Sequence, residues 1–232
     1  MIAITFALPA ESSDFLRRLR NQSRMDRNGI HTVRGDIDNR TVEVVHTGVG
    51  AKVCQQRVGT FLQDQQFDYL ISTGFAGALN DELEVGDLLL AKNFSTIDLN
   101  DRASLFLSFP IHMAELLTVS ALIDSSDERN RIARVSGAAA VDMETEFIAR
   151  ACAEHGVPLL SLRAITDTPR QAFPAPAKIL FDMERQRTDY RQLSLYVLKN
   201  PASLWRLVRF GIRVAHARKA LTETIVHLVR NL

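Results

Sequence analysis

Cysteine is scarce in this chain, which has Cys54 and Cys152 and no others among its 232 residues. The two lie far apart in apolar stretches with helical spacing, and neither stands at a metal-ligand spacing. This pattern argues against a disulfide-stabilised fold and predicts reduced core thiols in a cytoplasmic protein. We expect neither a metal nor an organic cofactor.

The chain also lacks an excess of charge of either sign. Its 28 lysines and arginines nearly balance its 27 aspartates and glutamates, which gives a formal net charge of +1. No overall positive field is therefore available to attract nucleic acid, and no nucleic-acid partner is expected.

Long apolar runs are absent as well, since none reaches the roughly 18 to 20 residues that a membrane-spanning helix needs. The apolar start of the chain has no basic leader and is followed at once by charged residues from Glu11 onward, so we interpret it as a first strand. With 46% hydrophobic residues, the chain can bury the core of a single soluble domain over residues 1–232.

Predicted strands and helices alternate along the chain. This alternation predicts an α/β fold with a central, mixed, mostly parallel sheet and helices on both faces. Periodicity and turn residues set the expected boundaries. The predicted strands are Ile2–Leu8, Ile30–Ile37, Thr41–His46, Tyr69–Ser72 and Val85–Ala91, and the predicted helices are Glu11–Arg20, Ala51–Gln65, Ala177–Met183, Tyr190–Lys199 and Pro201–Arg230, with two more beginning at Asp127 and Glu144.

Two acidic residues are predicted to meet at one edge of this sheet. A buried strand carries Arg163 and ends at Asp167, which places both charges at the carboxyl edge, where open α/β folds bind ligands. Glu144 begins a helix whose apolar positions repeat at helical spacing, so its first turn can stand beside the same edge. We interpret Asp142 as the cap of that helix.

The positions of these acids in the sequence resemble the pattern of the nucleoside phosphorylase superfamily, and within it that of the methylthioadenosine/S-adenosylhomocysteine nucleosidase branch. The resemblance also rests on Glu11 after the first strand and on the segment Thr73–Ala78, which we interpret as a turn, and it covers about residues 1–170. It implies a nucleoside phosphorylase-like fold and a small-molecule nucleoside substrate. It further implies that Glu144 holds the sugar hydroxyls and that Met143 packs against the sugar. A homodimer is the expected assembly.

The chemistry of N-glycosidic cleavage gives each acid a possible role. Asp167 suits the donor to the leaving base, because partial desolvation at a strand end raises a carboxyl pKa; its alternative role is a helix N-cap. Glu144 can accept hydrogen bonds from both ribose hydroxyls and offset the charge of an oxocarbenium-like transition state. Its alternative role is a first-turn acid favoured by the helix dipole.

Glu11 is the predicted base for a water nucleophile, with a solvated first-turn acid as its alternative. Phosphate, already an anion, needs positive charge instead, and phosphorylases of the superfamily place a glycine and an arginine where this chain has Leu8-Pro9-Ala10-Glu11. Hydrolysis is therefore favoured over phosphorolysis. Arg163 could orient a water, hold a phosphate oxygen, or pair with Glu144 or Asp167.

Two features depart from the nucleosidase pattern. Phe75 stands where that pattern has a serine, which removes one hydrogen bond to a water nucleophile and adds an apolar wall. The interval 93–135 is shorter than in the family, so the base-binding loop is assigned to Leu122–Ser126 by position alone. Gly74 and Gly77 allow the backbone to approach a ligand closely. The departures leave open a catalytically inactive nucleoside-binding protein.

The C-terminal segment, residues 186–232, is predicted to be a basic helical extension. Residues 199–232 contain seven lysines and arginines against one acid, Glu223. Together with the shortened middle, this extension is similar to a hopanoid-associated branch of the same superfamily, which implies an adenosine-linked lipid as substrate. The favoured interpretation of this tail is a helix that packs on the domain or on a dimer mate, and the alternative is peripheral contact with a membrane through residues 199–232. The residues that carry this alternative are Arg206, Arg209, Arg213 and His216, beside the apolar stripe of Leu204, Val208, Ile212 and Ala215.

Overall fold

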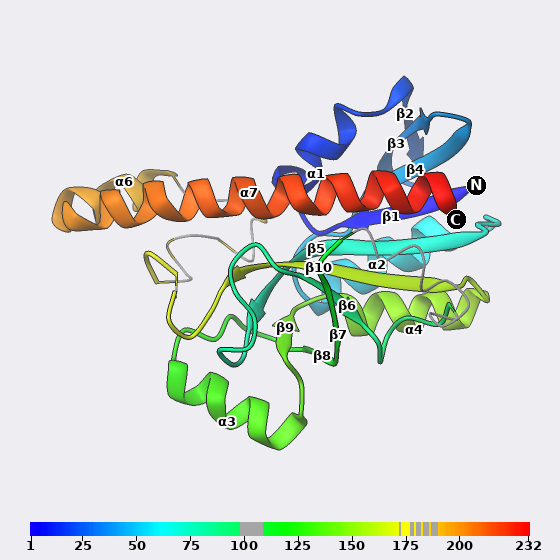
Figure 1. The fold of residues 1–232 in the computed structure, drawn as a ribbon. Helices are drawn as coiled ribbons and strands as arrows, with labels where there is room; N and C mark the ends of the chain where they lie inside the picture. Colours follow the sequence, from blue (N-terminus) through cyan, green and yellow to red (C-terminus); the bar gives the residue numbers. More distant parts are fainter. Residues whose placement is uncertain (98–108, 172, 177–178, 180–181, 183–185, 187–189) are drawn as a thin grey trace.

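A computed structural model of the protein describes residues 1–97, 109–171, 173–176, 179, 182, 186 and 190–232 (Figure 1). Part of the interval 93–135 and most of the predicted helix Ala177–Met183 lie outside the described residues. The strands are β1 Ile2–Phe6, β2 Arg20–Arg27, β3 Ile30–Ile37, β4 Arg40–His46, β5 Tyr69–Ala78, β6 Leu88–Ala91, β7 Ile111–Ala114, β8 Leu116–Thr118, β9 Ala140–Asp142 and β10 Leu159–Asp167. The helices are α1 Pro9–Leu16, α2 Ala51–Leu62, α3 Ser126–Ser136, α4 Thr145–His155, α6 Tyr190–Lys199 and α7 Ala202–Asn231.

The strands form one ten-stranded mixed sheet with the order β2-β3-β4-β1-β5-β10-β6-β7, while β9 pairs with β5 and β8 pairs with β9. The central strands β4, β1, β5 and β10 are parallel to their neighbours in this group. The predicted α/β fold with a mixed, mostly parallel sheet is therefore confirmed. Because parallel strands end at the same edge, the segments after β1, β5 and β10 lie close together.

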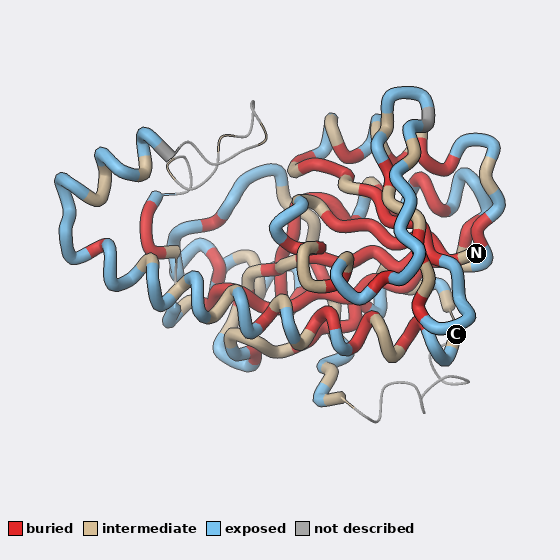
Figure 2. Tube along the Cα trace, turned by 90° about the horizontal axis from the view of Figure 1, so that it is seen from above, coloured by how far each residue is buried: buried red, intermediate tan, exposed pale blue. Residues whose placement is uncertain are grey.

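Helices cover both faces of the sheet, and the side-chain alternation of β1 shows how. Ile2 and Ile4 point to the face covered by α1 and α7, whereas Ala3 points to the face covered by α2 and α4. The strands between these two layers are the buried centre of the molecule (Figure 2). A sheet buried on both faces needs apolar side chains on both, which explains the continuous apolar run at the start of the chain.

The polar strand β2 was not predicted. We expected a helix as far as Arg20, but α1 ends at Leu16 and residues 20–27 pair antiparallel with β3 at the sheet edge. Its sequence, RNQSRMDR, is mostly polar and has no alternation of apolar residues. A strand at the sheet edge buries few side chains and does not require such alternation. Periodicity therefore gave no signal for it.

The segment Thr73–Ala78 is a strand and not the turn that we predicted. It continues β5, which pairs parallel with β10 from Leu70 to Gly77 and antiparallel with β9 at its end. Gly74 has a backbone φ of +155°, and a Cβ placed there would lie 3.4 Å from Oε2 of Glu11. The glycines thus allow close packing along a continuous strand and do not reverse the chain.

Helix α7 has two halves with different environments. Its C-terminal half packs on the sheet through Ala217, Leu221, Ile225 and Leu228, all of which are buried. Its N-terminal half extends past the sheet together with α6 (Figure 1). No helix in the described part of the chain combines the length and the apolar character that a membrane crossing requires.

Both cysteines are buried, and we predict that they do not react in the folded protein. Cys54 is 0% and Cys152 is 1% exposed, and burial raises the pKa of each thiol to about 12. Because the thiolate is the reactive form, a thiol reagent such as Ellman's should label neither residue at neutral pH and both after unfolding in urea. Labelling of the native protein at the rate of free cysteine would contradict this packing.

Candidate active site

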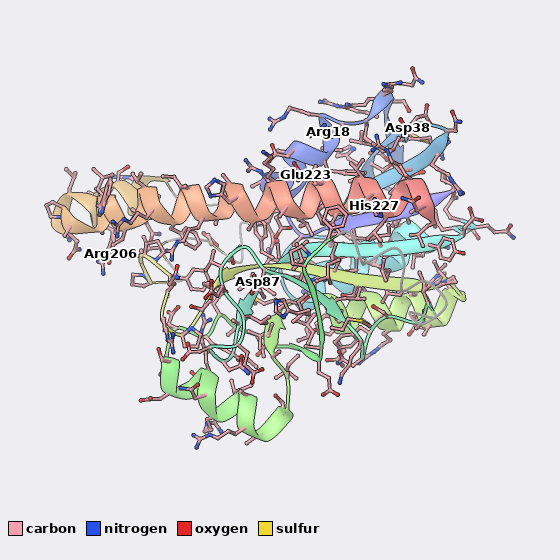
Figure 3. The ribbon with its side chains drawn as sticks, viewed as in Figure 1. Arg18, Asp38, Asp87, Arg206, Glu223 and His227 are labelled. Carbon is pink, nitrogen blue, oxygen red and sulfur yellow. The ribbon has the colours of Figure 1, made fainter. Side chains whose placement is uncertain are left out.

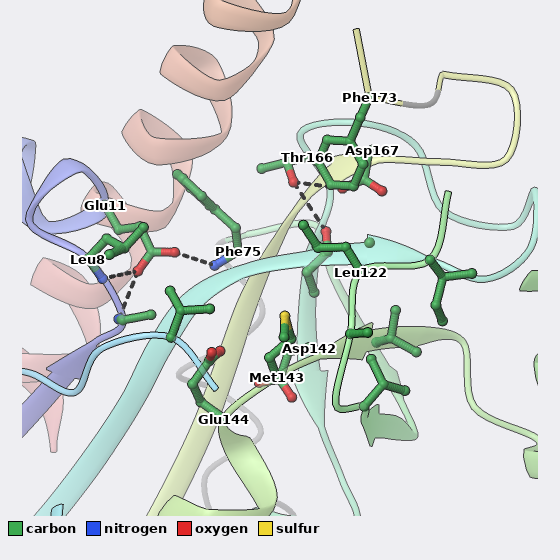
Figure 4. A pocket seen from close by; sticks show the side chains of 18 of the residues that line it. Leu8, Glu11, Phe75, Leu122, Asp142, Met143, Glu144, Thr166, Asp167 and Phe173 are labelled. Carbon is green, nitrogen blue, oxygen red and sulfur yellow. Dashed lines mark hydrogen bonds between the residues drawn. The ribbon is translucent and has the colours of Figure 1, made fainter. Parts of the chain in front are cut away.

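The carboxyl ends of the central parallel strands open into a cavity of about 290 Å³ (Figure 4). This position is where open α/β sheets bind ligands, and the volume is near the lower end for small-molecule sites. Arg163 is the one predicted site residue that does not line it. Those that do are Glu11, Phe75, Gly77, Met143, Glu144 and Asp167.

Glu11 reaches the cavity from the first turn of α1. Its Oε2 accepts hydrogen bonds from the backbone N–H groups of Ala7 at 2.8 Å and Leu8 at 3.0 Å, and its Oε1 accepts one from Phe75 at 3.4 Å. The residue is only 6% exposed, so it is not a solvated surface acid. Burial raises the pKa of Glu11, while these N–H groups and the positive charge of Arg163 oppose the rise.

Glu144 lies across the cavity at the N-cap position of α4, next to Met143 (Figure 4). Its Oε1 accepts a hydrogen bond of 2.9 Å from the backbone N–H of Gly50, whose φ of +88° is a conformation that favours glycine. Burial, and then the negative charge of Asp142, raise the pKa of Glu144 to about 8. The neutral form of this carboxyl is therefore favoured more in the folded protein than in water.

Arg163 is buried in the wall beside the cavity and is fully engaged with protein atoms. Its Nε donates to Asp142 at 3.0 Å, its Nη1 donates to the carbonyls of Ser72 and Leu162, and its Nη2 donates to the hydroxyls of Ser72 and Thr145. A guanidinium has five N–H donors, and all five are used here. The predicted pairing with Glu144 or Asp167 is wrong, because the partner is Asp142.

Asp142 also accepts a hydrogen bond from the backbone N–H of Thr145 at 3.1 Å. The side chain therefore caps the first turn of α4, as predicted, although Glu144 holds the N-cap position in the backbone. Since the same carboxylate pairs with Arg163, it joins α4 to strand β10.

Asp167 ends β10 at the opposite side of the cavity and pairs with a residue that we did not predict, Arg129 of α3. Nη2 of Arg129 donates to Oδ2 of Asp167, and Thr166 Oγ1 donates to Oδ1 at 3.0 Å. Burial raises the pKa of Asp167, and the guanidinium charge opposes the rise. A Cβ at Gly77 would lie 2.8 Å from Oδ2 of Asp167, so the glycine leaves room for this carboxyl.

Arg129 is 2% exposed and is held by two backbone carbonyls as well as by Asp167. Its Nε and Nη2 donate to Ile123, and its Nη1 donates to Ala78. The sequence contains one signal for it: Arg129 shares the face of α3 that carries the partly buried Ile132 and Ala133, whereas Arg131 and Arg134 are exposed.

Apolar side chains close the rest of the cavity. Leu122 and Ile123 contribute from the loop before α3, in the segment assigned by position to the base-binding loop. Phe173 follows β10, and its ring meets Phe210 of α7 edge-on at 5.8 Å between centroids. With Val214 of α7, these aromatic rings form an apolar rim at the site.

No group of three or more histidine, cysteine, aspartate or glutamate side chains among the described residues could hold a metal ion. The predicted lack of a cofactor stays a prediction. Four carboxyl groups line the described cavity, those of Glu11, Asp142, Glu144 and Asp167, together with one arginine, Arg129, and Asp142 is paired with Arg163 in the wall.

The chain belongs to the phosphorylase superfamily, because the model of that family matches residues 1–116 and 108–199. The resemblance noted from the sequence is thereby confirmed. A relative at 26% identity is a 5′-methylthioadenosine/S-adenosylhomocysteine nucleosidase of Staphylococcus epidermidis, over 72% of this chain and 86% of the relative. The enzyme of the same name from Shewanella halifaxensis is 22% identical over 75% and 88%.

Solved structures of a futalosine hydrolase and of a nucleosidase have the same fold as this chain. A futalosine hydrolase mutant of Helicobacter pylori superposes with a TM-score of 0.74 at 15% identity and covers 100% of this chain and 99% of its own. The nucleosidase of Streptococcus pneumoniae with a transition-state inhibitor superposes with a TM-score of 0.72 at 19% identity, over 99% and 98%. The arrangement of helices and sheet in this chain is therefore the same as in these two structures.

We predict that Glu144→Gln stabilises the fold at alkaline pH. The folded pKa of Glu144 is raised from 4.5 to about 8, so the wild-type carboxyl costs stability increasingly as pH rises through this interval. Glutamine keeps the oxygen that accepts from Gly50 but carries no charge. Urea unfolding should show the variant about 1–3 kcal/mol more stable at about pH 8, with a smaller difference at about pH 5.

Glu154→Gln, an exposed glutamate near the end of the same helix, is the matched control and should change stability little at either pH. A Glu144→Gln protein that is less stable than the wild type at about pH 8 would contradict the raised pKa.

Proposed function

We propose that the protein is a nucleosidase that hydrolyses the N-glycosidic bond of a 5′-modified adenine nucleoside. The observation that carries the proposal is the convergence of three buried carboxyls, Glu11, Glu144 and Asp167, on one cavity from three separate elements. Their environments differ, as acid and base roles require. The nucleosidases among the relatives support the substrate class.

Asp167 acts on the leaving base. Burial raises its pKa and so favours the protonated form, which donates its proton to the base as the bond from C1′ to nitrogen breaks. The bonding electrons leave with the base, which the proton neutralises. Arg129 and Thr166 fix the orientation of the carboxyl.

Glu11 acts on the water. Three backbone N–H groups hold its carboxylate in place, and burial brings its pKa upward, toward the range in which a general base works. It accepts one proton as the water oxygen bonds to C1′. Glu144 binds the ribose hydroxyls from the other side and Met143 packs against the sugar, which steadies the developing positive charge on the ring.

Charge favours water over phosphate as the nucleophile. Phosphate needs free cationic donors, yet Arg163 gives all five of its N–H groups to protein atoms. Arg129 is the only lysine or arginine among the described residues that line the cavity, and it is paired with Asp167. These contacts support hydrolysis.

A second candidate is phosphorolysis on the same scaffold, with an adenosine-linked lipid as substrate. The apolar rim of Phe173, Phe210 and Val214 favours a bulky apolar 5′ group. Incubation of methylthioadenosine and S-adenosylhomocysteine with and without phosphate separates the reactions. A free ribose sugar without phosphate supports hydrolysis, and a sugar 1-phosphate formed only with phosphate rejects it. Tight adenine binding without either product would indicate an inactive binding protein.

We predict that Asp167→Asn lowers the rate of cleavage by about 10²- to 10⁴-fold, because asparagine cannot transfer a proton to the base. Release of adenine, followed by absorbance, is the measurement, and circular dichroism checks the fold. Asp64→Asn, at an exposed position with a backbone φ of +56° that asparagine tolerates, is the control and should keep full activity. A variant at Asp167 that keeps more than half of the rate would reject the acid role.

We predict that Glu11→Gln slows hydrolysis while the affinity for adenine changes little. Glutamine retains an oxygen for the N–H groups of Ala7 and Leu8 but cannot take a proton from water. Steady-state rates and calorimetric titration with adenine separate the two effects, with the exposed Glu82→Gln as control. If phosphate restored the full rate to the variant, the protein would be a phosphorylase.

A further inference from the structure

Exposed apolar side chains are concentrated at one end of the molecule. Of the nine large hydrophobic residues that are exposed among those described, six lie on α6 and on the first half of α7. Residues 202–213 of α7, here called the α7 arm, carry four of them. These are Leu204 at 55%, Trp205 at 61%, Val208 at 45% and Ile212 at 53% exposure.

The spacing of these residues gives the α7 arm a continuous apolar stripe. Leu204, Val208 and Ile212 follow each other at intervals of four, which places them on one side of the helix, with Trp205 beside Leu204. The sequence alone left open whether this stripe packs on the domain. Leu204, Val208 and Ile212 do not pack on the domain, because each is exposed, although Phe210 in the same half of the helix contacts Phe173. The large apolar residues of α7 that are buried begin after Ala217.

Arginines border the stripe. The guanidinium of Arg209 lies 5.1 Å from the ring centre of Trp205, and Arg206 and Arg213 share a groove with Arg209. The only acid in residues 199–232 is Glu223, which projects from a distant turn of α7, far from Arg206 (Figure 3). The α7 arm is thus apolar and purely cationic.

This combination selects the partner. A second copy bound through the same face would bring arginine against arginine, because a two-fold interface is made by the same patch on both subunits. Nucleic acid would satisfy the arginines but would leave Leu204, Val208 and Ile212 in water. A bilayer with anionic lipids can bind both kinds of side chain. Its phosphates pair with the arginines, its acyl chains bury the aliphatic side chains, and tryptophan is favoured at the boundary between membrane and water.

We propose that the α7 arm docks the protein peripherally on an anionic lipid bilayer. The helix lies in the plane of the membrane, its stripe enters the boundary between headgroups and acyl chains, and Arg206 and Arg209 bind lipid phosphates. The folded domain stays outside the bilayer, attached through the second half of the same helix.

Trp205 is the only tryptophan of the chain, so the tryptophan fluorescence of the unmodified protein comes from the α7 arm alone. Titration with vesicles of phosphatidylcholine and phosphatidylglycerol should shift the fluorescence emission to shorter wavelength, and lipids brominated on the acyl chain should quench it. Vesicles of phosphatidylcholine alone should have a much smaller effect, and added salt should reverse the binding. No shift and no co-sedimentation with anionic vesicles at low salt would overturn the proposal.

Variants on the exposed half of the helix keep the core intact. Arg206→Gln with Arg209→Gln should weaken partitioning into anionic vesicles by about fivefold per arginine, since each contributes about 1 kcal/mol near the surface. The exposed pair Arg131→Gln with Arg134→Gln on α3 is the charge-matched control. Leu204→Ser with Val208→Ser should also weaken binding, whereas Val135→Ser, at an 82% exposed position on α3, should not.

Two other outcomes would assign the surface to a different partner. An emission shift that depends on protein concentration in the absence of vesicles would show that a second copy covers the arm. A shift with single-stranded RNA, under conditions in which anionic vesicles cause none, would indicate nucleic acid. Either result contradicts membrane docking.

Discussion

The buried guanidinium of Arg163 is the interaction on which the site depends. It joins strand β5 through Ser72, its own strand β10 through Leu162, the end of β9 through Asp142 and the start of α4 through Thr145. Leaving one partner of such a pair unmatched in a protein interior costs about 3–5 kcal/mol, so these elements hold one arrangement. The same positive charge favours the ionised forms of Glu11 and Glu144, which face the cavity. Arg163 is therefore best described as a positioning residue that acts through the carboxyls around it.

The cavity is lined by buried carboxyl groups, which are unfavourable in a protein core. Glu11, Glu144 and Asp167 are each nearly removed from water, and burial makes charge on each unfavourable. Backbone N–H groups hold Glu11 and Glu144, neither of which has a cation paired directly with it among the described residues, whereas Asp167 is paired with the guanidinium of Arg129. A bound sugar with hydroxyl groups would supply further partners. Such a site is less stable without its ligand than with it, which is common where chemistry requires shifted pKa values.

The sequence predicted more of the fold than of the contacts between side chains. The carboxyl edge of a parallel sheet binds ligands in open α/β folds, so Asp167, which ends a strand, and Glu144, which begins a helix, could be placed in one crevice from the sequence. Glu11 was added to them by the family resemblance. Strand β2 gave no periodic signal because its edge position leaves it polar, and the glycines of β5 suggested a turn because glycine is ambiguous without its packing. Arg129 is one of three arginines in α3, and its place on the same face as Ile132 and Ala133 was a weak signal whose meaning became clear only from its burial in the structure. Which side chains form ion pairs, such as Arg129 with Asp167, depends on the distances between helices and strands, and the local sequence pattern does not give those distances.

The division of α7 also bears on the order in which the chain can fold during synthesis. Strands β1, β5 and β10 and the helices α2 and α4 all precede residue 168, so they can bury one face of the sheet before the second half of α7 has been synthesised. The other face is covered in part by α1, and the rest of its cover comes from residues 217–229 of α7. Until then the apolar side chains of β1 and β10 on that face stay open to water or to a chaperone that binds extended apolar segments. The last helix therefore completes the domain, and it does so after the strand ends that form the site already exist.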